Sequence, residues 1–281
     1  MIMGTPMATN TDTRMGILDY DFMRTAFAAS GIVAVTAGIV GVFLVGRGQT
    51  FAGHALSHVG FAGATAAGLL GIAPIWGMIV FTLAAGVGMG ALGERLSGRD
   101  VAIGVILALA LGFGLLFLHY YTAFATQATA LLFGNVLAVQ GSTVLLLAAL
   151  AVVSLTALAA ISRPLLFATL QPELAEAKGV PVRAVGIAFM GVVALAVSAS
   201  VQIVGVLLVF ALMVGPAAAA ERLTSTLRGG LIVAAVLALA EAWLGITVAF
   251  YTDWPTSFCI SALSALVYFA TLALPRRAAA V

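Results

Sequence analysis

Nine long apolar runs, separated by short loops that contain charged residues, glycine or proline, restrict this chain more than any other feature of its sequence. Each run has roughly 20 residues, the length that an α-helix needs to cross the hydrocarbon core of a lipid bilayer. The runs are Phe22–Val45, Phe51–Leu70, Pro74–Leu92, Val101–His119, Thr143–Ile161, Ala184–Ser200, Val204–Ala220, Leu231–Tyr251 and Phe258–Leu274. The pattern predicts an all-α, polytopic transmembrane helix bundle of about nine spans, with roughly eight to ten as the range.

The composition agrees with burial in lipid. Apolar residues make up 63% of the 281 residues and charged residues only 8%, whereas a soluble domain carries about 25% charged residues. A soluble fold is therefore excluded, because a body of this size needs more polar surface. The net charge of +2 is small and the basic residues do not gather with aromatic ones, so we expect no nucleic-acid partner. A single cysteine, Cys259, excludes an internal disulfide and a cysteine-rich metal cluster.

Lysine and arginine concentrate in alternate loops, and this asymmetry predicts the orientation of the bundle. Ten of the 12 basic residues fall on one side if the chain crosses the bilayer nine times. They are Arg47, Arg95, Arg99, Arg163, Lys178, Arg183, Arg222, Arg228, Arg276 and Arg277. Cytoplasmic loops carry an excess of basic residues, so we expect the N-terminus outside and the C-terminus in the cytoplasm. Only Arg14 and Arg24 do not fit this arrangement.

Two stretches differ from the nine runs. Residues 1–21 form a polar N-terminal segment without the apolar core of a cleavable signal peptide. Residues 22–281 are therefore expected to form one transmembrane domain. The segment Tyr120–Gln140 is less apolar than the runs, and it predicts either a loop with a short helix or a re-entrant segment at the membrane surface.

Three ionisable residues lie deep within the runs, where a charged group is costly and so indicates function. His54 and His58 are four residues apart, which places both imidazoles on one face of a helix, and two such rings can bind one metal ion. The helical rise puts His58 about 13 Å from Gln49 and Glu241 about 16 Å from Gly230, which is close to the middle of the bilayer in both cases. The sequence thus predicts a metal site formed by His54, His58 and Glu241.

Structural roles compete with each of these assignments. An intramembrane histidine is often only hydrogen-bonded to a neighbouring helix, and Glu241 could equally bond to a serine or threonine. His119 lies beside two tyrosines at the outer end of its run, which is typical of an interfacial aromatic belt; acceptance of a metal ion from outside is the alternative. An intramembrane metalloprotease is disfavoured, because Ala55 follows His54 at the position where such a helix carries its catalytic glutamate.

The longest cytoplasmic loop, residues 162–183, is expected to contain a short surface helix from Pro172 to Lys178. Pro172 and Glu173 suit the first turn of a helix, and Gly179 suits its C-terminal end. An ATPase subunit would bind such a helix, and an ordinary solvated loop is the alternative. The chain shows no Gly-x-x-x-x-Gly-Lys phosphate loop, so we do not expect it to be the ATPase. The residues expected to couple to an ATPase are Gln171, Pro172, Glu173, Glu176 and Gly179.

Several segments, taken in order, resemble the zinc/manganese/iron permease family of ABC importers, over nearly the whole chain from Phe22 to Leu274. The family usually shows Gly-Asp-Ala-Leu-Ser-His where this chain has Gly53–His58. The other matching segments are Asp100–Gly104 with the pattern Asp-x-x-Ile-Gly, Leu132–Val139, Gln171–Arg183, Val204–Leu208, Pro216–Ala218 and Asp253–Ser257.

The resemblance implies the multi-pass permease subunit of an ATP-driven importer in the cell (inner) membrane, with residues 22–281 as the permease domain. It implies no enzyme activity and no permanently bound cofactor. The expected partners are a cytoplasmic ABC ATPase, an extracytoplasmic metal-binding protein and a second permease copy, forming a homodimer. The metal path of the family uses an acidic residue and a histidine four apart, which match His54 and His58. An imidazole in place of the carboxylate favours zinc over manganese as the transported ion.

The sequence therefore predicts import of a divalent transition-metal ion, with zinc favoured and manganese or iron as the other candidates. Two other functions stay open. A secondary cation transporter without an ATPase partner would need several buried acidic residues shared among its spans. An ABC permease for a vitamin or siderophore would keep the ATPase partner and place no metal on the histidine pair.

Overall fold

The computed structural model describes residues 17–93, 98–120, 132–206 and 208–274. Within these ranges every regular element is a helix. The elements are η1 (Ile17–Asp19), α1 (Asp21–Gly46), α2 (Thr50–Leu69), α3 (Pro74–Ala91), α4 (Arg99–Tyr120), η3 (Val136–Ala138), α6 (Gly141–Leu170), α7 (Pro172–Ala177), α8 (Val182–Val204), α9 (Val209–Leu223), α10 (Leu227–Thr252) and α11 (Thr256–Leu272).

Each of the nine apolar runs coincides with a long helix, and the described part of the chain adds the short α7 between α6 and α8. Six of the long helices, α1, α3, α4, α6, α8 and α10, are long and apolar enough to cross a bilayer by length and composition. Helix α2 has the length, at 20 residues, but its two histidines lower its hydropathy. Helices α9 and α11 are shorter, at 15 and 17 residues. The membrane-embedded helical bundle is confirmed, whereas the count of nine spans stays a prediction.

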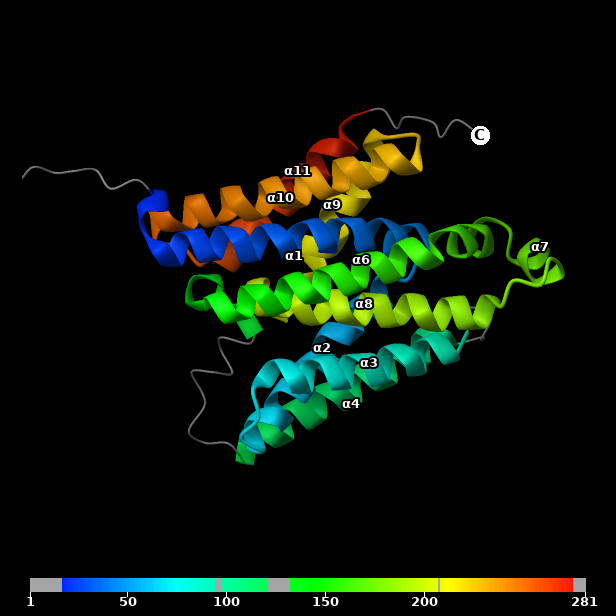
Figure 1. Ribbon diagram of the computed structural model, residues 1–281, viewed down its shortest axis with the longest axis horizontal. Coiled ribbons are helices and arrows are strands. Elements are labelled where there is room, and N and C mark those ends of the chain that lie inside the picture. The colour runs from blue at the N-terminus through cyan, green and yellow to red at the C-terminus, as the bar shows by residue number, and fades with distance from the viewer. Residues whose placement is uncertain (1–16, 94–97, 121–131, 207, 275–281) are drawn as a thin grey trace, which may run out of the picture.

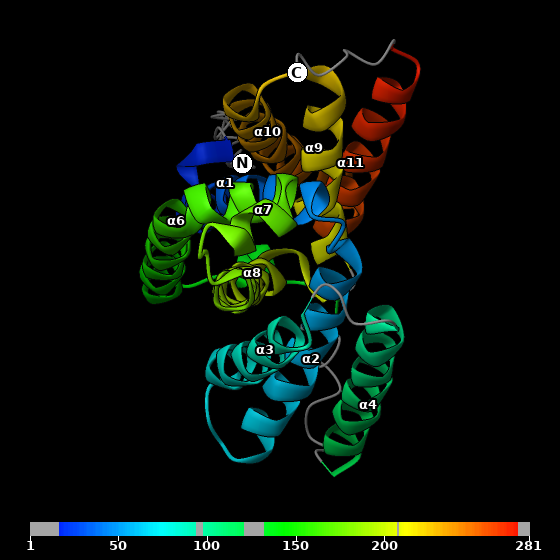
Figure 2. The same ribbon diagram turned by 90° about the vertical axis from the view of Figure 1, so that its right-hand side faces the viewer.

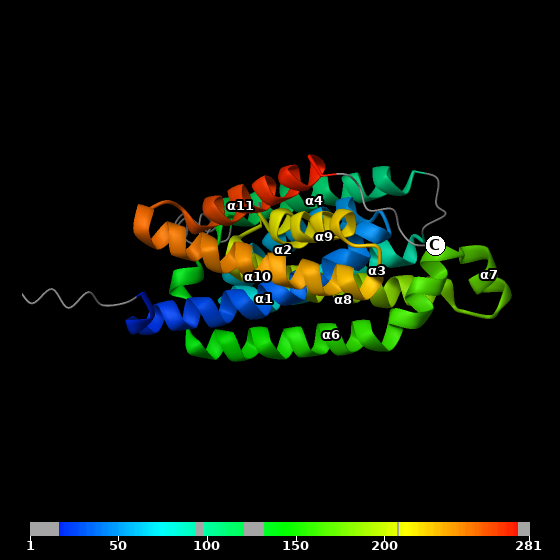
Figure 3. The ribbon, with the colours of Figure 1, turned by 90° about the horizontal axis from the view of Figure 1, so that it is seen from above.

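The long helices run roughly along one axis and alternate in direction (Figures 1 and 3). Helix α1 begins at one end of the bundle and α11 finishes at the other, as an odd number of crossings requires (Figure 1). Arg47, Arg99, Arg183 and Arg222 consequently lie at the end of the bundle that also carries α7. This charge distribution is the one expected for a cytoplasmic end.

Helices α2, α3 and α4 form one group, and α1, α9, α10 and α11 form another, with α6 and α8 beside and between them (Figure 2). Most of α1 and α8 is buried, whereas α4 and α6 are largely exposed. Most of their exposed side chains are apolar, among them Val105, Leu115 and Leu145. Side chains of this kind suit contact with lipid or with another membrane protein.

Helix α6 extends further than the sequence predicted. The expected span ended at Ile161, but the helix continues through Pro164 to Leu170. Tertiary contacts support this extension, because the Arg47 guanidinium donates hydrogen bonds to Leu165 O at 3.3 Å and Thr169 Oγ1 at 2.5 Å. Burial and the neighbouring positive charge of Arg99 lower the pKa of Arg47 to about 10, so Arg47 is still charged at neutral pH.

The junction between α8 and α9 also differs from the prediction. We expected a span to begin at Val204, but α8 ends there and α9 begins only at Val209. The chain breaks at Gly205, whose φ of 77° and ψ of 165° are accessible to glycine almost alone. Gly134, also at positive φ, packs its backbone directly against the backbone of Gly205. Non-helical backbone at membrane depth is tolerated only where protein buries it, and this glycine contact provides the burial.

Candidate functional site

The two histidines of α2 lie together, as their spacing predicted. Their ring centroids are 4.9 Å apart and the rings are nearly perpendicular, at 84°. His58 is buried, with 8% of its surface exposed, and His54 is half-buried. The Nδ1 atoms of both rings are buried and have no hydrogen-bond partner among the described residues. Buried polar atoms are normally paired, so two unpaired imidazole nitrogens one helical turn apart are suited to bind a cation.

Neighbouring residues fix this part of α2. The Ser57 hydroxyl donates a hydrogen bond to His54 O at 2.7 Å, and Leu44 of α1 packs closely over Gly53. On the other side, the ring of His54 meets that of Phe210 edge-to-face, with centroids 5.8 Å apart. The histidine pair therefore lies where α2 meets the first turn of α9. No spacing or motif in the sequence pointed to Phe210.

The structure does not bring Glu241 into this site. Among the described residues, no group of three or more histidine, cysteine, aspartate and glutamate side chains lies close enough to hold one metal ion. Glu241 is buried in α10, which packs against α1, α9 and α11, whereas α2 packs mainly against α3, α4, α8 and α9. The predicted set of three ligands from one chain is therefore corrected to a pair. Equal depth in the bilayer does not make two residues neighbours, because the helices lie at different lateral positions.

The predicted surface helix is present as α7, one residue shorter than expected. Pro172 occupies its first turn. At its end, Gly179 N donates to Glu176 O and Val180 N donates to Ala175 O, both at 2.9 Å, with Gly179 at a φ of 80°. This is the Schellman arrangement that ends many helices at a glycine. Glu173 and Glu176 are exposed, and α7 projects beyond the ends of the long helices (Figure 1).

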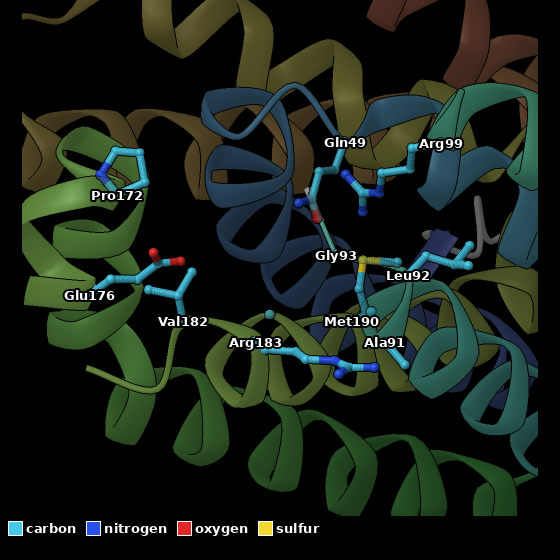
Figure 4. A pocket seen from close by; sticks show the side chains of 12 residues that line it. Gln49, Ala91, Leu92, Gly93, Arg99, Pro172, Glu176, Val182, Arg183 and Met190 are labelled. Carbon is cyan, nitrogen blue, oxygen red and sulfur yellow. The ribbon is translucent and has the colours of Figure 1, made fainter. Parts of the chain in front are cut away.

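A cavity of about 570 Å³ separates α7 from the ends of α2, α3 and α4. Pro172 and Glu176 lie on one side of this cavity, and Gln49 and Arg99 lie on the other (Figure 4). Arg183 of α8 lines it as well. The cavity thus separates α7 from the ends of α2, α3 and α4, and three of the residues that line it are charged: Arg99, Glu176 and Arg183.

Comparison with known proteins places the chain among transporters. The model of the ABC 3 transport family matches residues 19–275. The chain belongs to the ABC 3 transport family. The manganese transport system membrane protein MntC of Listeria monocytogenes is 26% identical over 255 residues, which cover 90% of this chain and 91% of MntC. The manganese import system permease protein ScaB of Streptococcus parasanguinis is 28% identical, and the match covers 90% of each chain. A chain of PsaBC from Streptococcus pneumoniae, solved with a Fab, superposes with a TM-score of 0.82 at 25% identity, covering 92% of this chain and 93% of that chain.

Family membership confirms the resemblance seen in the sequence. This ABC 3 permease is a multi-pass membrane protein and the transport subunit rather than an enzyme.

The third histidine of the chain, His119, lies exposed at the end of α4 opposite Arg99, with its ring 5.6 Å from that of Tyr120. This position matches the interfacial aromatic belt that was one of its two predicted roles. The buried Cys259 is a free thiol.

Proposed function

We propose that this ABC 3 permease imports a divalent transition-metal ion and that His54 and His58 are its contact with the ion in transit. The observation that carries the proposal is the pair of buried, unpaired Nδ1 atoms on adjacent turns of α2. Imidazole nitrogen is a common ligand for zinc and its neighbours in the first transition row. The printed names of the relatives MntC and ScaB support a metal cargo.

Two imidazoles from one chain leave a metal ion incompletely coordinated, since zinc sites in proteins are almost always four-coordinate. We propose that a second copy of this chain supplies another His54 and His58, so that a homodimer encloses the ion between two α2 helices. The partly exposed edge of His54 and the exposed Phe210 beside it suit such a contact. Two weak pairs that separate together also release the ion readily, as transport requires.

The two ends of the bundle are the proposed binding sites of the other two partners. We propose that a cytoplasmic ABC ATPase binds α7, with Gln171, Pro172, Glu173, Glu176 and Gly179 at the contact, and that an extracytoplasmic metal-binding protein delivers the ion at the opposite end. The exposed acidic side chains of α7 and its projection from the bundle support this assignment. Membership of an ABC family disfavours the alternative of a secondary transporter that works without an ATPase.

The decisive experiment is metal-stimulated ATP hydrolysis by the complex reconstituted in lipid vesicles. The permease is co-purified with its ATPase and supplied with its binding protein loaded with Zn²⁺, Mn²⁺ or Fe²⁺. We expect a divalent metal to stimulate hydrolysis and to appear inside the vesicles. Stimulation by a vitamin or siderophore, with none by any metal, would assign the permease to the alternative cargo class.

Replacing His54 with aspartate tests the choice of metal. Zinc is favoured here because imidazole is a softer ligand than carboxylate, so His54→Asp should lower the ratio of zinc to manganese uptake by about tenfold. Competition between the two ions in vesicle uptake measures this ratio. His119→Asp makes the same replacement at the exposed end of α4 and should leave the ratio unchanged. An unchanged ratio in His54→Asp would show that this residue does not contact the ion.

A further inference from the structure

Glu241 is a buried acid that the proposed transport site does not use. It lies in the middle of α10 with 2% of its surface exposed. Neither of its carboxyl oxygens accepts a hydrogen bond from the described part of the chain. An unpaired carboxylate buried at membrane depth is one of the costliest groups a protein can hold, so its protonation state needs an explanation.

Ser264 lies near Glu241, on helix α11, which packs against α10. The hydroxyl of Ser264 donates its hydrogen bond to Ala211 O of α9 at 2.9 Å. A hydroxyl has one hydrogen to donate, so Ser264 can only accept a hydrogen bond from the Glu241 side. A carboxylate has no hydrogen to give, whereas a protonated carboxyl group has one. The Ser264 hydrogen is therefore not available to an ionised Glu241, and a hydrogen bond between these two side chains needs the proton to be on Glu241.

Among the described residues, the turns packed around Glu241 offer no positive charge that would stabilise its ionised form. The turns of α1 that face α10 at this level carry Ser30 and Thr36 as polar side chains, and both hydroxyls donate within α1. Cys259 of α11 lies beside Val248, nearer the outer end of α10. The remaining titratable residues described in the three helices packed on α10 are Asp21, Arg24, Glu221 and Arg222 near helix ends and Tyr268 one turn beyond Ser264.

The acceptor of the Ser264 bond lies in a weak part of α9. Pro216 has no N–H, so Leu212 O lacks its usual partner within the helix. Gly215 precedes this proline, and a side chain at residue 215 would collide with Ser264 Oγ. The contact from α11 therefore braces α9 where its own hydrogen bonds are incomplete. Ala211, which receives this contact, follows Phe210, whose ring packs against His54.

We propose that Glu241 is protonated and, through Ser264, fixes the first turn of α9 so that Phe210 holds His54 in place beside His58. Glu241 and Ser264 are positioning residues, since neither joins the histidine pair. The ligand of Glu241 is a proton rather than the transported metal. The link to transport rests on the proposed function of the histidine pair, whereas the protonation of Glu241 does not.

Infrared difference spectroscopy of the purified permease in lipid tests the protonation by itself. Wild-type protein should show the carbonyl stretch of a protonated carboxyl group at neutral pH, and Glu241→Gln should lack this band. Glutamine is neutral, has nearly the same shape and can donate to Ser264, so this variant should fold normally. A carboxylate band lost in Glu241→Gln, in place of the carbonyl band, would overturn the proposal.

Metal uptake by the reconstituted complex tests the positioning. Glu241→Leu and Ser264→Ala should each raise the metal concentration for half-maximal uptake about tenfold, the lower end of the loss seen for outer partners of metal ligands. Glu241→Gln should restore the wild-type value. Ser261→Ala is the matched control, because the Ser261 hydroxyl donates to Ser257 O within its own helix at 2.8 Å.

The outcomes separate the two proposals. Wild-type behaviour of Glu241→Leu would show that Glu241 does not position the site, and failure of Glu241→Gln to transport would show that the ionised form is needed. If His58→Ala transports normally, the proposed ion path along the histidine pair is wrong. The infrared measurement still decides whether Glu241 is protonated, because it does not depend on the histidine pair. Size-exclusion chromatography of each variant identifies those that do not fold.

Discussion

Replacing His58 with alanine is expected to reduce metal uptake to the level of vesicles without ATP. His58 is the more buried of the two imidazoles and its Nδ1 has no partner among the described residues. Its loss would leave one imidazole per chain, and therefore two ligands instead of four between the proposed pair of copies. Uptake of Zn²⁺ and Mn²⁺ into vesicles that contain the permease, its ATPase and its binding protein measures the effect.

His119→Ala is the matched control for this experiment. It removes the same ring from the same chain, but from the exposed end of α4 beside Tyr120, and it should transport as the wild type does. ATP hydrolysis without metal should be equal in both variants, since neither replacement touches α7. Normal uptake by His58→Ala would remove this residue from the ion path and would leave the cargo unassigned.

Sequence reasoning succeeded for the fold where the signal was local and repeated. Each of the nine apolar runs became a helix, and four basic residues expected on one side lie at one end of the bundle: Arg47, Arg99, Arg183 and Arg222. It failed where a tertiary contact decided the outcome. Helix α6 continues past Ile161 because Arg47 bonds to its last turns, and α9 starts late because Gly205 packs on Gly134, which lies about 70 residues earlier in the chain.

The same division holds for the site. The spacing of His54 and His58 was enough to bring their rings together, because residues four apart share a helix face. Glu241 was placed beside them by depth alone, and depth says nothing of which helices are neighbours. Nothing in the sequence marked Phe210 or Ser264 as part of the site, because aromatic residues and serines are common in apolar runs. The sequence alone could not have linked them to the site, because their roles follow from the packing of α9 on α2 and α11.

Replacing Gly205 with alanine is expected to prevent stable folding, although it adds only a methyl group. The backbone of Gly205 has φ 77° and ψ 165°, a region that costs other residues about 1–3 kcal/mol. A Cβ at this residue would also collide with the backbone of Gly134 and Leu132, and such overpacking costs a further 1–3 kcal/mol or so. The two together are about 2–6 kcal/mol, a large part of the roughly 5–15 kcal/mol that stabilises an ordinary domain.

Neither cost can be relieved by a small shift, because the atoms that a Cβ would meet are backbone atoms of the packed 132–134 segment rather than the ends of flexible side chains. The melting temperature and the monodisperse fraction after detergent extraction measure the effect. Gly191→Ala is the control: residue 191 is helical in α8 with nothing within 4 Å of its added Cβ. Alanine there should stabilise the helix by up to about 1 kcal/mol. If the melting temperature of Gly205→Ala equals that of the wild type, the junction between α8 and α9 can rearrange. In that case the position of α9 beside His54 does not depend on the contact between Gly205 and Gly134.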